Sequence, residues 1–284
     1  MSLATAVVDV RTLLRDMPFT DTITTAPTTG AGTSMVVSTA AAWEVGDVLE
    51  FTGPATTGRY EQVLITANSS GTLTIVRAYN ETTAGTHTTA ELARKNPRFG
   101  GVQIEEAINN VLDNETFPEI WQVNEASVTP SPTTTYIYDL PAAYEGFVDL
   151  VMLRTGTEDL VRIRATEDDN VPVAISATNK ALRVGSWPRT DVNATLFYRA
   201  RITSASFPAD VEPVVAWGAV ARLLKSEGAG VADRRDEQDR QGRIFRASRF
   251  FDEEFRAAKG RYRAGLMARW GSVRRYRRSR IVSA

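Results

Sequence analysis

The chain has 284 residues, enough for one large domain or two to three small ones, and its 43% apolar residues can bury a real core. It contains no cysteine and one histidine, His87, which excludes disulfides, thiolate metal sites and any site that needs two histidines. The net charge is −1, and neither a secretory signal nor an apolar stretch of membrane-spanning length is found, so we expect a protein folded in the cytosol.

Residues 1–18 are predicted to form an N-terminal amphipathic helix, which Ser2 can cap and Pro18 ends. Its apolar residues recur every three or four positions: Leu3, Ala6, Val7, Val10, Leu13, Leu14 and Met17. A single helix of this length is marginal in water. It must therefore pack on another element or on a neighbouring chain.

Residues 19–98 are rich in Thr, Gly, Ala and Ser, and are predicted to form an inserted small β-domain. Short apolar runs alternate with turn residues, which indicates a small barrel or sandwich with strands near residues 34–38, 48–52, 61–66 and 72–77. His87 lies in a loop-like Thr-rich stretch, and we expect no catalytic role for it.

Residues 99–121 are predicted to contain a central helix with a buried apolar face. Glu105 and Glu106 are adjacent on this helix and point about 100° apart, so they are not a general acid/base pair but part of a solvated face.

Residues 122–206 are predicted to form a second β-rich block, with strands near residues 147–154, 160–165, 181–184 and 194–202. The acidic run at residues 167–170 could ligate a divalent cation through oxygen. It lacks the ligand spacing and the turn glycine of a calcium loop, so a turn is the preferred interpretation and no metal site is predicted.

Residues 207–268 are predicted to form a C-terminal helical hairpin. The first helix starts near Asp210 and is expected to end at Gly228 and Gly230, and Asp233 can cap the second helix. One apolar face of the second helix steps by three or four residues: Ile244, Ala247, Phe251, Phe255, Ala258, Tyr262 and Leu266.

Residues 269–284 are predicted to be a basic tail, disordered in a free subunit and ordered on docking. No acidic residue follows Glu254, whereas ten basic residues do, so the preceding residues carry eleven excess negative charges. Such a tail can be a solvated segment, can bind nucleic acid through phosphates, or can dock on an acidic face of a neighbouring protein. Trp270 and Tyr276 lie among the arginines and could stack or anchor an interface.

Together these elements predict an α+β protein. We expect a helical bundle, made of the N-terminal helix, the central helix and two long C-terminal helices, with two inserted β-rich domains. No catalytic, cofactor-binding or metal-binding constellation is found in the sequence, so we expect a protein that is not an enzyme.

This order of elements resembles the head-to-tail adaptor (connector) proteins of tailed bacteriophages. The resemblance is carried by the short N-terminal helix, the helix GVQIEEAINNVL at residues 101–112, the β-rich insertions and the long C-terminal helix with its basic tail. The segments VGDVLE (45–50), LTIVRAYN (73–80) and TTAGTH (82–87) also look like small β-modules of phage structural proteins.

The resemblance implies a virion protein of the head–tail neck that forms a homo-oligomeric ring, usually a dodecamer, beneath the portal. It implies contacts with the portal and with a downstream neck or tail protein, and a channel that passes DNA without sequence-specific binding; no membrane and no cofactor are implied. The residues expected to dock on the portal are Arg269, Trp270, Arg274, Arg275, Tyr276, Arg277, Arg278 and Arg280.

Two other functions stay open. The tail could serve a nucleic-acid-binding module, whose affinity would fall steeply with salt. Alternatively, the Thr-rich β-blocks could form a carbohydrate-binding surface with Trp43, Tyr60 and Tyr79 as stacking residues.

Overall fold

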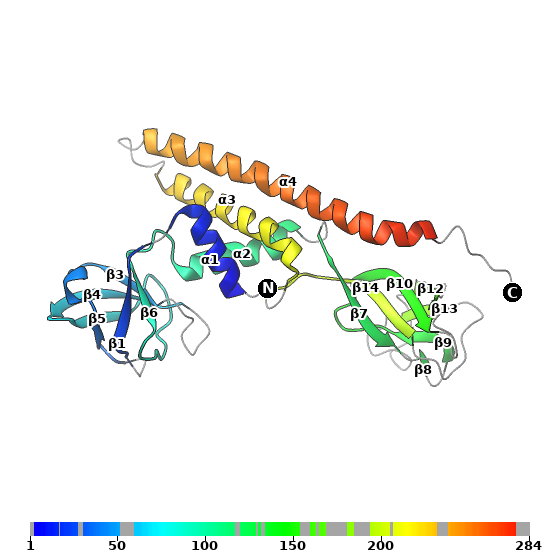
Figure 1. Cartoon of the computed structure of the whole chain (residues 1–284), viewed down its shortest axis with the longest axis horizontal. Coiled ribbons are helices and arrows are strands. Elements are labelled where there is room, and N and C mark those ends of the chain that lie inside the picture. The colour runs from blue at the N-terminus through cyan, green and yellow to red at the C-terminus, as the bar shows by residue number, and fades with distance from the viewer. Residues whose placement is uncertain are drawn as a thin grey trace. The chain divides into compact units, whose positions relative to one another are not determined.

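The computed structural model describes the chain in two compact units. Unit 1 consists of Met1–Glu115 and Ser204–Ala284, and unit 2 of Thr116–Thr203 (Figure 1). The described residues are 3–16, 18–27, 31–51, 60–116, 120–128, 130–131, 134–153, 160–162, 165–168, 181–184, 194–204, 207–231 and 238–276.

A closed antiparallel barrel forms one part of unit 1. Its strands are arranged in the order β1-β2-β5-β4-β3-β6, and pairing of β1 with β6 closes it. Strands β2 to β5 lie close to the predicted runs, whereas β1 and β6 were not predicted. The bounds are β1 Thr20–Thr25, β2 Ser34–Val37, β3 Val48–Phe51, β4 Gln62–Ser69, β5 Thr72–Tyr79 and β6 Leu92–Lys95.

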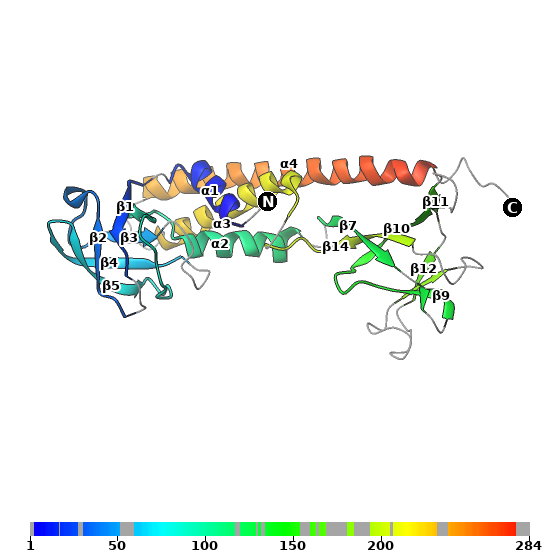
Figure 2. The same ribbon diagram turned by 60° about the horizontal axis from the view of Figure 1, so that its bottom comes forward.

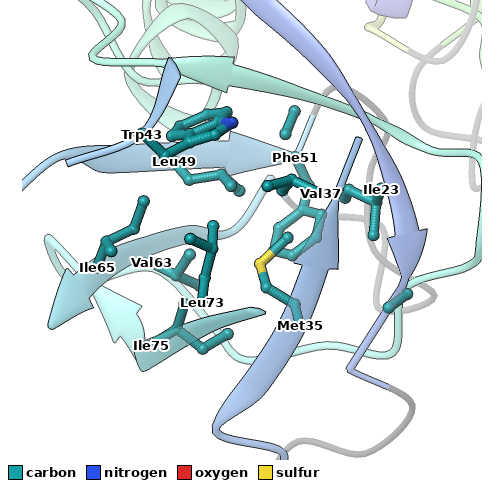
Figure 3. Close-up of a cluster of buried hydrophobic side chains, with 12 residues drawn as sticks. Ile23, Met35, Val37, Trp43, Leu49, Phe51, Val63, Ile65, Leu73 and Ile75 are labelled. Carbon is teal, nitrogen blue, oxygen red and sulfur yellow. The ribbon is translucent and has the colours of Figure 1, made fainter. Parts of the chain in front are cut away.

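The barrel interior is filled by apolar side chains from every strand (Figure 3). On β5, Leu73 and Ile75 are buried while Thr72 and Thr74, which alternate with them, are exposed; this is the period of two expected for a strand with one buried face. The other labelled core residues are Ile23, Met35, Val37, Trp43, Leu49, Phe51, Val63 and Ile65.

The described part of unit 1 also contains four α-helices. They are α1 Leu3–Leu14, α2 Gly101–Asn110, α3 Glu212–Val231 and α4 Gln238–Tyr276. A π-helical segment, Val111–Thr116, continues α2. Figures 1 and 2 both draw α3 between α2 and α4. All three helices meet at Gly218 of α3, where an added Cβ would lie 2.9 Å from both Phe255 of α4 and Val111.

Helices α3 and α4 form an antiparallel hairpin. Trp217 near the start of α3 packs on Phe251, and the Ser248 hydroxyl donates to the carbonyl oxygen of Ala221 at 3.3 Å. The prediction that Gly228 and Gly230 end the first helix is wrong, because α3 continues to Val231. Gly228 is buried within 3.2–3.4 Å of Ile244 and Phe245, as judged from the position of an added Cβ, so the missing side chain permits close helix packing.

Unit 2 contains two four-stranded sheets, with strand orders β11-β10-β14-β7 and β12-β13-β9-β8. Buried residues such as Val128, Leu182, Leu196 and Tyr198 form its core. The bounds are β7 Gln122–Val128, β8 Pro130–Ser131, β9 Thr134–Asp139, β10 Gly146–Leu153, β11 Leu160–Arg162, β12 Ala165–Asp168, β13 Ala181–Val184 and β14 Ala194–Ala200.

The predicted fold class, a helical bundle carrying two inserted β-rich domains, is wrong. The first β-block is a closed six-stranded antiparallel barrel that belongs with the four helices to one compact unit. The physical reason is a set of buried polar contacts between barrel and helices, described below, which the apolar periodicity of the sequence does not reveal.

Candidate functional site

The strongest candidate for a functional surface is the C-terminal part of α4. This helix has 39 residues and is therefore about 60 Å long. Its inward face is buried at Ile244, Phe255, Ala258 and Tyr262. Beyond Tyr262, residues 263–268 are exposed except for the half-buried Leu266, so Tyr262 is the last buried side chain among those of α4 whose burial the structure describes.

The exposed end of this helix carries only positive charge. After Glu254 every charged residue is Arg or Lys. Arg256, Arg261 and Arg263 are exposed, and none of them forms an ion pair with a residue that the structure describes. Earlier on α4, by contrast, Asp252 pairs with Lys225 of α3 at 2.6 Å, and Arg249 lies 3.3 Å from Glu253.

The residues predicted to dock on the portal divide into two groups. Arg269, Trp270, Arg274, Arg275 and Tyr276 belong to α4, which runs to Tyr276, so the first half of the segment predicted as a tail is helical. Arg277, Arg278 and Arg280 lie outside the described residues. The helix thus places the first five on one continuous element.

The joint between barrel and helices is a buried ionic cluster that the sequence analysis missed. The Arg11 side chain of α1 donates to Asp16 at 2.7 Å and to the Phe99 carbonyl oxygen at 3.1 Å, and it also pairs with Glu50 of β3. The second oxygen of Glu50 accepts from the Gly101 amide, at the start of α2, at 2.5 Å. Arg11, Asp16 and Glu50 are all buried.

One feature of the sequence could have predicted this buried cluster. Arg11 follows Val7 by four residues and precedes Leu14 by three, so it lies on the apolar face of α1. A charged residue on such a face requires a buried partner. The identity of that partner, Glu50, depends on the tertiary fold and carries no sequence signal.

A second buried cluster surrounds His87, in the segment between β5 and β6. The imidazole is stacked on Phe51 with ring centroids 3.4 Å apart. Its Nε2 lies 2.9 Å from Glu61 and its Nδ1 lies 3.2 Å from Glu91. Burial disfavours the charged imidazolium, but the hydrogen bonds to the two carboxylates outweigh this effect and raise the pKa of His87.

Glu61 is the centre of this cluster. Burial alone would raise its pKa, yet hydrogen bonds from Arg77, His87 and the amides of Gly85 and Ala78 lower the pKa to about 2. Both Arg77 contacts are short, at 2.5 and 2.6 Å. The carboxylate is therefore saturated with donors, which is the arrangement of a structural ion cluster holding residues 77–91 against the barrel.

Other residues singled out from the sequence are distributed as follows. Trp43 and Tyr60 are only 2% and 3% exposed, and the Trp43 indole donates to Asp21 at 3.0 Å, so neither ring is available as a carbohydrate platform in this structure. Tyr79 is half-buried. Glu106 is exposed and Glu105 half-buried.

The acidic run at residues 167–170 is described only in part. Glu167 and Asp168 lie in β12, and the next two residues are outside the described part of the chain. Among the described residues, no group of three or more His, Cys, Asp or Glu side chains is placed to hold a metal ion. In the same residues, no helix is both long and apolar enough to cross a membrane.

The sequence matches no model of a known protein family, and no curated protein matches it.

Proposed function

We propose that this protein is a structural component of a tailed-bacteriophage virion, an adaptor that forms a ring beneath the portal and joins head to tail. In this role it extends the DNA channel, and it has no catalytic activity. Residues 269–280 of each copy dock on the portal, and other surfaces meet the next neck or tail protein.

The observation that carries this proposal is the exposed, wholly basic end of α4. Because α4 extends beyond Tyr262 and every charged residue after Glu254 is basic, this end of the helix is suited to an anionic surface on another molecule. Trp270 and Tyr276 on the same helix would add aromatic anchors, which are enriched at the centres of protein interfaces.

The ion pairs between the barrel and the helices are also consistent with a structural protein. Arg98, which follows β6, pairs with Glu227 of α3 at 2.5 Å, in addition to the buried Arg11–Glu50 contact. These contacts attach the barrel to α1 and to α3.

The proposal is tested by deleting residues 270–284 in the encoding phage. We expect a folded subunit that no longer enters particles, together with heads that lack tails. The matched control is the full-length chain with Arg243→Gln and Arg246→Gln, which removes two arginines from the part of α4 that packs on α3. The control should assemble normally. Infectious, tailed particles from the deleted chain would contradict the docking role.

Location is tested independently by labelling a tagged copy under electron microscopy. Label at the single head–tail vertex supports the adaptor. Label on fibres or over the whole head would contradict it and favour a surface module.

A nucleic-acid-binding module is the second candidate, because the same exposed arginines could contact phosphates. It predicts duplex binding whose affinity falls steeply as salt rises. Absence of duplex binding at low salt would exclude this candidate.

A further inference from the structure

Two helical segments of unit 1 carry pairs of opposite charge, and the members of each pair are seven residues apart in the sequence. On α4, Arg256 and Arg263 are seven residues apart, which is about two turns or about 10 Å. Both are exposed, and they share the helix face that also carries the 64% exposed Met267. We call Arg256 and Arg263 the arginine row. Gly260 lies between them, and an added Cβ there would meet nothing within 4 Å, so the face is open.

The complementary row lies on α2 and the π-helical segment that continues it. Glu106 and Asp113 are also seven residues apart, and both are exposed. We call them the acidic row. The buried face of this helical stretch is formed by Ile104, Ala107, Ile108 and Val111, so the acidic row lies on the side turned away from the core.

No ion pair joins the arginine row to the acidic row within one chain. Arg256 and Arg263 form no ion pair with any residue that the structure describes. Figure 2 shows α4 and α2 separated by α3, within the same unit. Both arginines are therefore open to an anionic surface on a second molecule.

We propose that the arginine row of one copy docks on the acidic row of a second copy. This inference rests on the proposed ring and names the surfaces that would build it. The rows lie on different helices, so the contact is heterologous: each copy uses α4 toward one neighbour and α2 toward the other. Repetition of such a contact gives a closed ring when the rotation closes and a filament when it does not.

Charge balance favours a second copy over nucleic acid as the occupant. The ten basic residues after Glu254 nearly cancel the eleven excess negative charges of the rest of the chain. Copies therefore attract one another through opposite patches without a large net repulsion. A duplex that approached the arginine row would also meet the field of the acidic remainder of the protein.

The test is a charge-swap set measured on the purified full-length chain by sedimentation velocity at low and high salt. One variant combines Arg256→Glu with Arg263→Glu, and the other combines Glu106→Arg with Asp113→Arg. The matched control combines Arg243→Glu with Arg246→Glu, which makes the same charge change elsewhere on α4. Circular dichroism of each variant checks that the helices are intact.

We expect the wild type and the control to self-associate at low salt and to dissociate as salt rises. Each row variant alone should need a protein concentration at least about tenfold higher for the same assembly, because like charges then face each other. An equal mixture of the two row variants should restore assembly, since the reversed rows complement one another. The four substitutions combined in one chain should restore it as well.

Three results would overturn the proposal: a wild type that stays monomeric at low salt, row variants that assemble like the control, or row variants that fail to rescue each other. A fourth is loss of duplex binding in the arginine-row variant with unchanged self-association, which would assign the row to nucleic acid. Failure of this proposal can be distinguished from failure of the adaptor proposal. If the tagged protein is found at the head–tail vertex but the purified chain is monomeric, the adaptor proposal is retained and only this interface is rejected.

Discussion

The contact of three helices at Gly218 makes a quantitative prediction about packing. Replacing Gly218 by Ala places a methyl group 2.9 Å from a ring carbon of Phe255 and 2.9 Å from a methyl of Val111. Both neighbours are buried, at 6% and 0% exposure, so neither can move aside freely. Overpacking of this kind costs about 1–3 kcal/mol.

The same substitution also brings a gain, because Ala is favoured over Gly inside a helix by about 1 kcal/mol. Gly242 of α4 provides the matched control, since an added Cβ there meets nothing within 4 Å. Gly242→Ala should therefore stabilise the protein by up to about 1 kcal/mol. The difference between the two variants isolates the packing cost, and we expect it to be about 1–3 kcal/mol in favour of Gly242→Ala.

The measurement is urea unfolding followed by helical circular dichroism, with wild type and both variants in the same buffer. A change in the unfolding midpoint without a change in slope shows that stability alone has changed. Equal stabilisation by Gly218→Ala and Gly242→Ala would refute the reasoning, because it would mean that α2, α3 and α4 do not converge at Gly218.

Two further predictions concern the buried charged clusters. Because the pKa of His87 is raised in the folded protein, the imidazole holds its proton more tightly there than in the unfolded chain. This contribution to stability is fully present below about pH 6.5 and is lost as pH rises through the folded-state pKa. The urea midpoint should accordingly fall as pH rises above about 6.5, and His87→Gln should weaken this fall; an unchanged pH dependence in the variant would contradict the assignment. At the joint, Arg11→Met leaves Glu50 and Asp16 buried without their partner and should cost about 3–5 kcal/mol. The exposed Arg15→Met on the turn after α1 should change stability by less than about 0.5 kcal/mol, and equal effects of the two substitutions would show that the cluster is not buried in solution.

The elements that could be predicted from the sequence are those whose pattern is local. Strand β5 alternates buried and exposed residues, and α4 repeats apolar residues every three or four positions, so both were found near their observed places. Strands β1 and β6 were missed because their stabilisation is not local. Thr20–Thr25 has few apolar residues, and its role depends on pairing with Leu92–Lys95, far along the chain.

The same distinction explains the error in fold class. Apolar periodicity shows that a β-block exists, but the attachment of the barrel to the helices depends on Arg11, Asp16 and Glu50, which are charged residues in buried positions. Reasoning from hydrophobicity places such residues at the surface and so treats the barrel as a separate insertion. The burial of His87 was missed for the same reason, since the Thr-rich stretch around it is typical of an exposed loop.

The length of α4 is the feature that its own unit does not explain. Ordering a residue costs about 1–2 kcal/mol of backbone entropy, and a short helix without tertiary packing is marginal in water. Packing on α3 and the core stabilises the helix as far as Tyr262, but residues 263–268 bury little, although the helix continues to Tyr276. The repulsion among successive arginines adds a further cost to this stretch. A partner that supplies negative charge along this stretch would offset both costs, which is consistent with the proposed role of this end of α4 in assembly.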